Sequence, residues 1–252
     1  MAVYAFNNSI AQKLGEHSLI SNVTKLPQPV ASIWLSLCEM RFSNKIITSL
    51  SMFYAHTDYK SKSSNVGNGD EVIFDLTEGE WAAVQIPYLE GSYKPSQSRK
   101  LIIFLGAGGP STENFVKVYE PDAAALIFPS PSINSDVANH VGANAQVLKS
   151  QFRIDDEEII KVPPFSVLKA TEVSLKLLSI SKADDVSLIS LGTKPHSISA
   201  AIACMLSNEA TLVCRSPKKY RHSEGNPTGI SSLYVVEDLS NPGRLIDVPL
   251  AL

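Results

Sequence analysis

The sequence has few cysteines and no spacing that would join them to a metal or to one another. Its three cysteines, Cys38, Cys204 and Cys214, lie far apart, and none takes part in the C-x-x-C spacing of a redox or zinc motif. Isolated cysteines of this kind are usually small apolar core residues of proteins in a reducing compartment. The sequence therefore predicts neither a disulfide framework nor a metal site, and no cofactor is predicted.

Long apolar runs and a strong charge of one sign are also missing. No run approaches the ~18 apolar residues that a transmembrane helix needs, and residues 1–10 lack the basic and apolar regions of a secretory signal. The 22 Lys and Arg nearly balance the 25 Asp and Glu, so the net charge is −3 and the basic field of a duplex-binding protein is absent. We expect a cytoplasmic protein that binds neither membranes nor long duplex nucleic acid.

The motifs of common hydrolases are missing as well. The sequence contains no G-x-S-x-G, no H-E-x-x-H and no local Cys/His signature. The carboxylates of residues 155–158 are adjacent and cannot all face one centre, so they predict a solvated turn. Three histidines near strand ends, His56, His196 and His222, remain as candidates for proton transfer. Whether the protein is an enzyme stays open.

Short apolar runs alternate with amphipathic stretches along much of the chain. The 252 residues are 44% hydrophobic, which is enough for a core in one or two domains. Apolar strands followed by a short loop and a helix predict an α/β fold of Rossmann-like βαβ units with a mostly parallel sheet. The expected strands are residues 46–55, 100–105, 123–128, 186–191, 210–214 and 232–237, and the expected helices are residues 28–41, 111–119, 134–152, 166–181 and 195–207.

The sequence repeats itself once. Residues 18–25 read SLISNVTK and residues 187–194 read SLISLGTK, so that six of eight positions match at an offset of 169 residues. Each copy precedes a helix of small residues and then a strand that runs into a polar loop. This pattern predicts two pseudo-symmetric Rossmann-like lobes, residues 1–95 and 96–252, which could also form one continuous domain. Chance is the alternative, because short β-rich stretches resemble one another.

Ligands of open parallel sheets bind beyond the carboxyl ends of the strands. The first loop of suitable composition there is LGAGGPST, residues 105–112. Gly106, Gly108 and Gly109 would let the backbone approach a ligand or turn sharply, and Ser111 would bind an anion beside the N–H groups of the helix that follows. The alternative is a tight strand-to-helix turn without a ligand.

The second loop reads GTKPHS, again between a strand and a helix. Gly192 would allow close approach, Thr193 and Ser197 supply hydroxyls, and Lys194 supplies a point charge suited to phosphate. His196, in the first helical turn, would donate to or protonate a bound group. Alternatively, it caps the helix end and faces water. The convergence of glycine, hydroxyls and a cation favours a binding role.

Three further loops have a weaker form of this chemistry. A Thr-Lys pair without glycine ends the first copy of the repeat. Two polar segments after strands, residues 56–60 and 215–222, combine cations with a tyrosine ring on which a base would stack. For these two segments the alternative is a solvated polar loop. The predicted ligand residues of the three loops are Thr24, Lys25, Tyr59, Arg215, Lys218 and Tyr220.

The strand, the Gly-Thr-Lys-Pro loop and the small-residue helix together resemble the CARF family of Rossmann-like sensor domains. The doubling within one chain is similar to the related SAVED domains, which resemble two such units fused. The match covers residues 186–220 well and residues 18–59 loosely, whereas residues 69–151 contain no motif that aligns.

The resemblance implies that the protein binds a cyclic or linear oligonucleotide second messenger of prokaryotic antiviral defence. Thr193 and Lys194, with Thr24 and Lys25, would then line a site between the two halves. Such sensors usually sit beside an effector domain, for which these 252 residues leave no room. The effector would be a separate chain, or the domain would cleave its own ligand.

Two other functions agree with the same residues. One is an enzyme on the same fold that acts on a nucleotide or a sugar phosphate, and the other is a regulatory or scaffold subunit of a larger complex. In each case the sequence leaves open whether the protein forms a homo-oligomer.

Overall fold

The structure is a computed structural model in which two main sheets and four α-helices are described. The predicted helix at residues 28–41 and the predicted site residues Thr24, Lys25 and His222 lie outside the described part, as do Gly108 and Gly109. The described residues are 18–22, 49–59, 62–64, 71–73, 77–87, 89–91, 98–106, 110–130, 135–207, 209–220, 225–237 and 245–251.

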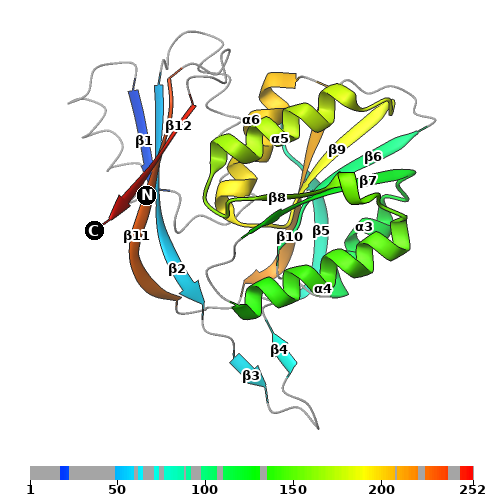
Figure 1. The fold of residues 1–252 in the computed structure, drawn as a ribbon, viewed down its shortest axis with the longest axis horizontal. Coiled ribbons are helices and arrows are strands. Elements are labelled where there is room, and N and C mark those ends of the chain that lie inside the picture. The colour runs from blue at the N-terminus through cyan, green and yellow to red at the C-terminus, as the bar shows by residue number, and fades with distance from the viewer. Residues whose placement is uncertain are drawn as a thin grey trace.

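The larger sheet has six strands in the order β5-β10-β9-β6-β7-β8 (Figure 1). All neighbouring pairs are parallel except β5 with β10. The five parallel strands thus follow the order third, second, first, fourth, fifth, as in doubly wound α/β sheets. The prediction of an α/β fold with a mostly parallel sheet is confirmed. The strands are β5 (Thr77–Gln85), β6 (Arg99–Phe104), β7 (Ala123–Pro129), β8 (Ile159–Val162), β9 (Asp185–Ser190) and β10 (Ala210–Tyr220).

Helices cover both faces of this sheet, which explains its continuous apolar strands. Successive side chains of a strand point to opposite faces, so Leu101 and Ile103 of β6 pack in one buried cluster and Ile102 and Phe104 pack in the other. The first cluster includes residues of α3 and α4, and the second includes residues of α5 and α6. The helices are α3 (Pro110–Val118), α4 (Ser135–Phe152), α5 (Val167–Ile180) and α6 (Lys194–Ser207), with a short 3-10 turn, η1 (Asp156–Glu158), before β8.

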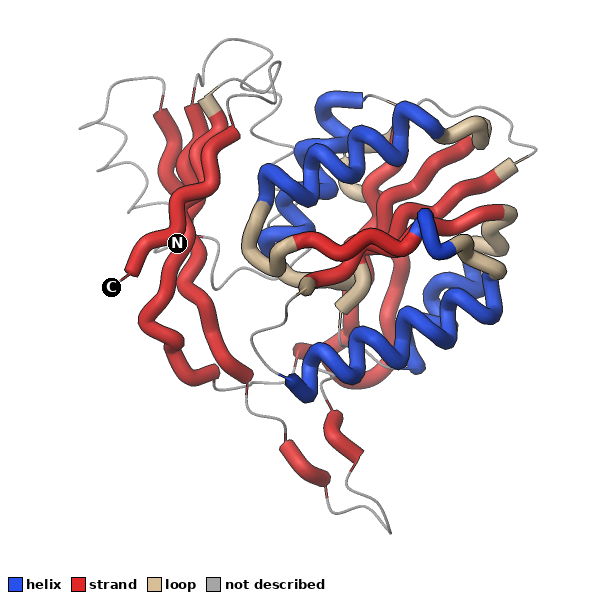
Figure 2. The backbone as a smooth tube through the Cα atoms, viewed as in Figure 1, coloured by secondary structure: helices blue, strands red, loops and turns tan. Residues whose placement is uncertain are grey.

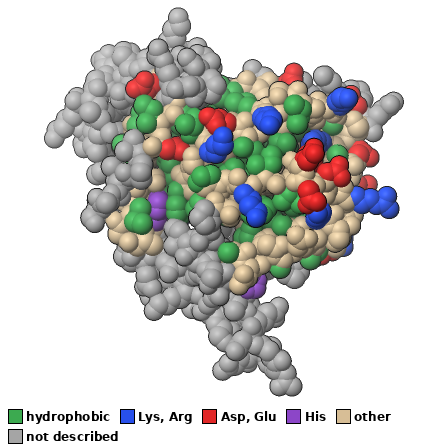
Figure 3. Space-filling view, viewed as in Figure 1, with side chains coloured by type: hydrophobic (Ala, Val, Ile, Leu, Met, Phe, Trp, Pro, Cys, Tyr) green, Lys and Arg blue, Asp and Glu red, His purple; other side chains and the backbone are tan. Residues whose placement is uncertain are grey.

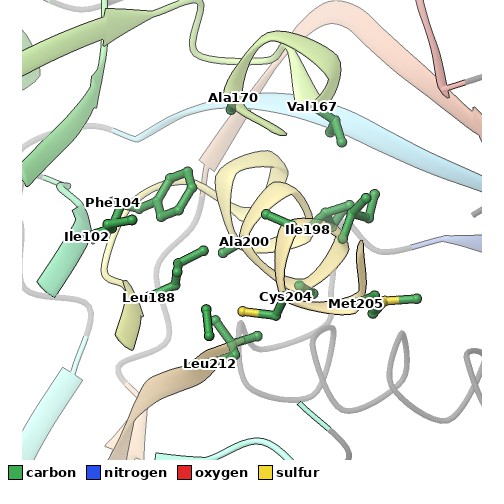
Figure 4. Packing of buried hydrophobic residues seen from close by; sticks show 14 of the residues in the cluster. Ile102, Phe104, Val167, Ala170, Leu188, Ile198, Ala200, Cys204, Met205 and Leu212 are labelled. Carbon is green, nitrogen blue, oxygen red and sulfur yellow. The ribbon is translucent and has the colours of Figure 1, made fainter. Parts of the chain in front are cut away.

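Helix α6 lies against the sheet because small side chains line it. Ala200 and Cys204 face Leu188 and Leu212 of the neighbouring strands in Figure 4. Cys204 and Cys214 are buried and form no disulfide within the described part of the chain, which confirms the core role predicted for them. Within the described ranges, no helix combines the length and the hydropathy that crossing a bilayer requires.

The smaller sheet has four strands in the order β1-β2-β11-β12 and packs on the α5 and α6 side of the molecule (Figures 1 and 2). Its first two strands are parallel, and β11 is antiparallel to β2 and to β12. The sheet adds a fourth layer to the molecule. Its strands are β1 (Ser18–Asn22), β2 (Ser49–Tyr59), β11 (Gly225–Val236) and β12 (Leu245–Ala251).

Two segments predicted as polar loops are strands, so these predictions are wrong. Strand β2 continues to Tyr59 and β10 continues to Tyr220. A short antiparallel pair follows β2, formed by β3 (Lys62–Ser64) and β4 (Glu71–Ile73). The reason is pairing with distant partners: β2 pairs with β11 and β10 pairs with β5, and local composition carries no sign of this.

The two long strands pair across the predicted lobes. Strand β5, from the first 95 residues, pairs with β10, whereas β11, from the later part of the chain, pairs with β2. The pair of β2 with β11 contains a shift in register between Pro227 and Ser231. The pair of β5 with β10 contains one between Pro217 and Lys219. The division into residues 1–95 and 96–252 stays a prediction.

Candidate functional site

The carboxyl ends of β6 and β9 meet at the centre of the larger sheet. Phe104 of β6 is paired with Ser190 of β9, and the helices that follow these two strands, α3 and α6, cover opposite faces. This is the switch point at which doubly wound sheets bind their ligands. The two glycine-containing loops that the sequence singled out therefore lie side by side.

The glycines of these two loops permit a close contact between the loops themselves. A Cβ at Gly106 would lie 2.2 Å from the carbonyl oxygen of Leu191, which is far inside van der Waals distance. Among the described glycines, Gly229 alone has a positive φ, so Gly106 and Gly192 serve close approach and not a left-handed turn. The backbone of one loop occupies the space that a side chain of the other would need.

The hydroxyls of the second loop hold its backbone in place. Thr193 Oγ1 donates to Pro164 O at 3.2 Å and accepts from His196 N at 3.4 Å. Ser197 is buried, and its Oγ lies 2.5 Å from Ser190 Oγ. Both hydroxyls thus have protein partners at the start of α6. Their predicted contact with a ligand stays a prediction.

His196 is fully buried, with 0% of its surface exposed. The alternative in which it faces water is therefore wrong. The ring of His196 contacts Pro163, whose carbonyl oxygen is 3.3 Å from Nε2. Burial lowers the pKa of His196 to about 4, although the hydrogen bond to Pro163 opposes this. The imidazole is therefore neutral at neutral pH.

Lys194 is the first residue of α6 and is half-buried. Its Nζ lies 6.0 Å from the centre of the Tyr54 ring on β2, which is within the range of a cation–π contact. Burial lowers the pKa of Lys194. The predicted phosphate-binding cation therefore sits between the larger sheet's loops and the smaller sheet.

Residues 163–166 connect the candidate site to the smaller sheet. Pro163 and Pro164 accept the hydrogen bonds from His196 and Thr193. The next carbonyl, that of Phe165, accepts a hydrogen bond of 2.9 Å from the Tyr234 hydroxyl of β11. This segment is therefore held by the Gly192 loop on one side and by the smaller sheet on the other.

The N-terminus of α5 is capped by a carboxylate from the smaller sheet. Asp247 of β12 accepts hydrogen bonds from Ser166 Oγ at 2.6 Å and from Leu168 N at 3.1 Å. Burial raises the pKa of Asp247, and these hydrogen bonds oppose the rise. An anion is favourable at a helix N-terminus, so the protein itself fills this position.

His56 lies away from the switch point but contacts the same segment. Its ring stacks on Phe165 with 3.6 Å between centroids, and Nε2 is 2.8 Å from Ser232 Oγ of β11. Burial lowers the pKa of His56. Two of the three candidate histidines, His56 and His196, therefore contact the same segment, residues 163–166. The sequence did not predict this arrangement.

The remaining predicted residues are more scattered. Arg215 lies within β10, one residue beyond Cys214, the residue paired with Ser190, and therefore stands near the carboxyl end of β9. Lys218 is exposed further along β10, and the backbones of Tyr59 and Tyr220 end the two long strands. Ser111 belongs to α3.

Local sequence patterns did not indicate the residues that connect the two sheets. Asp247 and Tyr234 bond to Ser166 and Phe165, which are 81 and 69 residues away in the chain, and the Tyr54 ring lies 6.0 Å from Lys194 Nζ. The helix start expected at residue 166 is correct, because Ser166 is the N-cap of α5, but the local sequence did not show what lies against it. No local pattern in the sequence signals such a contact.

The described surface has no field of one sign on the face in Figure 3, where Lys and Arg are interspersed with Asp and Glu. A shallow hollow lined by Lys149, Arg153 and Asp155 lies at the C-terminal end of α4. Because α4 runs back from the end of β7 to the start of β8, this hollow is at the opposite edge of the sheet from Gly106 and Gly192.

No model of a known protein family matches the sequence, and no match was found among curated proteins. The candidate site therefore rests on its own geometry, and the resemblance of the Gly-Thr-Lys-Pro loop to CARF domains stays a prediction.

Proposed function

We propose that the protein binds a phosphate-bearing nucleotide at the carboxyl ends of β6 and β9. The observation that supports this most is the convergence of two loops, around Gly106 and Gly192, which the sequence singled out separately. They meet at the switch point, where nucleotide ligands of doubly wound sheets bind. The ligand class that follows from the resemblance is a linear or cyclic oligonucleotide second messenger, with a separate protein chain as effector.

The charges of the site support phosphate binding. Helix α6 has 14 residues and begins at Lys194, so the positive end of its dipole and the Lys194 ammonium favour an anion beside this loop. Arg215, within β10, lies near the same edge. By contrast, Asp247 already occupies the N-terminus of α5, which leaves the start of α6 as the better anion site on this side of the sheet.

A two-lobed, duplicated architecture belongs to the same proposal. The first copy of the repeat lies on β1, which is parallel to β2, and the second lies on β9, which is parallel to β10. Strands β2 and β10 both have 11 residues and both end in a tyrosine. On its other side, each pairs with a long antiparallel strand. These correspondences favour duplication over chance.

Binding is better supported than catalysis by His196. A general acid should have a pKa near the working pH, whereas burial lowers that of His196 to about 4. Its Nε2 is also occupied by Pro163. We therefore place His196 in the binding site and assign it no proton transfer.

Isothermal calorimetry tests the proposal. The panel holds nucleoside monophosphates, nucleoside triphosphates and short linear and cyclic oligonucleotides. We expect at least one to bind, and Lys194→Ala to weaken that binding about tenfold or more through loss of a charge-assisted contact. Lys117→Ala is the matched control, because Lys117 is exposed on α3 and pairs with Glu113. Absence of binding by the whole panel, or equal loss in both variants, would overturn the proposal.

A further inference from the structure

One face of α4 borders the loop of Gly106. Asn144 Nδ2 lies 3.5 Å from the carbonyl oxygen of Gly106. Val141 and Ala145, in the same turn of α4, belong to the buried cluster that contains Leu105, the residue before this glycine. Helix α4 therefore passes the carboxyl end of β6 at this turn, and the contact fixes where the preceding turn stands relative to the candidate site.

His140 lies one turn before Asn144 on the same side of α4. The helix begins at the carboxyl edge of the sheet and runs towards the amino edge, because it connects the end of β7 to the start of β8. Four residues at a rise of about 1.5 Å each place His140 about 6 Å beyond Asn144 in the direction of the carboxyl edge. Helical side chains also tilt towards the N-terminus of their helix. His140 therefore stands outside the end of β6, where ligands of such sheets bind.

His140 can be reached from solvent, unlike the two candidate histidines nearer the sheet. Its side chain is partly exposed, whereas His56 and His196 are buried. Ala138 precedes the buried Val141 by nearly one turn, yet it is exposed, so α4 leaves the packed layer of the molecule at this point. A ligand beyond the end of β6 can therefore contact the imidazole of His140 at the surface.

His140 and Lys194 lie on opposite faces of the six-stranded sheet. Lys194 begins α6, and α4 packs in the other of the two buried clusters. A single phosphate cannot contact both side chains, because the ends of β6 and β9 lie between them. A ligand that carries phosphates at intervals along its length can cross this edge near Gly106 and Gly192 and contact both.

We propose that His140 binds a second phosphate of the nucleotide whose first phosphate is bound at Lys194, so that the site selects ligands with two phosphates separated by a nucleoside. This inference rests on the proposed nucleotide site. A histidine ring donates N–H hydrogen bonds to phosphate oxygens and carries a positive charge once it is protonated. Such charge-assisted bonds are stronger than bonds between neutral groups. The ligand class is therefore an oligonucleotide and not a mononucleotide.

Calorimetry with matched ligands gives the first test. A nucleoside 5′-monophosphate carries one phosphate, and the 5′-phosphorylated dinucleotide of the same base carries two. We expect the dinucleotide to bind about tenfold more tightly, through one additional charge-assisted hydrogen bond. A dinucleotide that binds no more tightly than the monophosphate overturns the inference and leaves the nucleotide site standing.

Substitutions of His140 separate a phosphate contact from stacking of a base on the ring. His140→Ala should weaken binding of the dinucleotide about tenfold and leave binding of the monophosphate unchanged, whereas Lys194→Ala should weaken both. His140→Arg should keep the preference for the dinucleotide, because a guanidinium binds phosphate, and His140→Phe should lose it. Asn139→Ala is the matched control, at an exposed neighbouring position of α4.

The outcomes distinguish this inference from the proposed function. Absence of binding by every ligand overturns both. If Lys194→Ala weakens binding and His140→Ala does not, only the inference is overturned. Equal losses in His140→Ala and Asn139→Ala, or a preference kept by His140→Phe and lost in His140→Arg, likewise contradict the phosphate contact alone.

The wild-type protein supplies a second readout if a variant does not fold. Diethyl pyrocarbonate modifies accessible histidine rings, and mass spectrometry of the peptide that contains His140 follows the reaction. We expect the dinucleotide to slow the modification of His140 several-fold and the monophosphate to leave its rate unchanged. An equal rate with and without the dinucleotide contradicts the inference.

Discussion

The two faces of the six-stranded sheet are built differently. On the α3 and α4 side, the buried cluster is formed by aliphatic and aromatic side chains such as Leu126 and Phe115. The α5 and α6 side also buries apolar residues, but it holds His196, Ser197 and Ser199 among them, all 0% exposed. The fourth layer, the smaller sheet, packs on this second side only.

This difference between the two faces indicates which residues stabilise the fold and which determine its detailed geometry. Apolar burial is non-directional and roughly proportional to area, so the α3 and α4 face supports the fold without dictating a detailed geometry. Hydrogen bonds are directional and costly to leave unmade, so the polar groups of the other face orient the loop at residues 192–197 and the segment at residues 163–166. The candidate site lies on the directional face.

The largest expected effect belongs to the apolar face. Leu126→Ala should lower the free energy of unfolding by about 2–5 kcal/mol, because it removes a fully buried side chain and leaves a cavity. The loss should be the same at neutral and at acid pH, as measured by urea denaturation. Val118→Ala on exposed α3 surface is the control and should change little. If the free energy of unfolding lost in Leu126→Ala depended on pH, the distinction between an apolar face and a pH-sensitive polar face would be wrong.

The next effect is a pH dependence that belongs to the polar face. The pKa of His196 is lowered from 6.5 to about 4, so the unfolded chain binds a proton in this window that the folded protein does not. Its contribution to stability is present above about pH 6.5 and is lost as the pH falls towards about 4, on the order of 3 kcal/mol in all. His56 acts in the same direction.

His196→Gln should flatten this profile, because a neutral side chain at the same place has no proton to gain. Urea denaturation across the window measures it, and the remaining slope comes from the other titrating groups, among them His56 and Asp247. A profile of the His196→Gln variant as steep as that of the wild type would show that the buried imidazole does not set the acid sensitivity of this face.

The smallest effect concerns the contact between the two sheets. Asp247→Ala removes the acceptor of Ser166 Oγ and Leu168 N and should lower the free energy of unfolding by about 1–3 kcal/mol. Because burial raises the pKa of Asp247, its contribution is present at acid pH and is lost as the pH rises through the folded-state pKa. The substitution should therefore cost most at acid pH.

Glu172→Ala is the matched control for Asp247→Ala. Glu172 pairs with Lys169, and both side chains are more than half exposed, so that pair contributes little. Thermal denaturation of both variants over a pH series gives the comparison. Equal effects would mean that the cap on α5 is no stronger than a surface ion pair.

The local sequence was informative wherever one element is defined by its own residues. The stretch at residues 166–181 predicted a helix, and α5 runs from Val167 to Ile180 with Ser166 as N-cap and Ser181 as C-cap. The run at residues 100–105 likewise marks β6. In each case periodicity and capping residues are properties of neighbours in the chain.

The local sequence was uninformative where partners are distant. Residues 215–220 are polar and read as a loop, yet they form the second half of β10 because β5 pairs with them. Asp247 shows no local sign of the helix that it caps, since Ser166 is 81 residues away. Pairing of this kind depends on which strands the fold brings together.

The amino-acid sequence by itself determined the α/β class, the helices of the larger sheet and the two glycine loops, because apolar runs, caps and glycines act through their immediate neighbours. The tertiary structure alone decided that the loops of Gly106 and Gly192 touch, that His196 is buried, and that residues 163–166 are held from two sides. Those features arise from strand order and from contacts between residues far apart in the chain, and no local pattern encodes them.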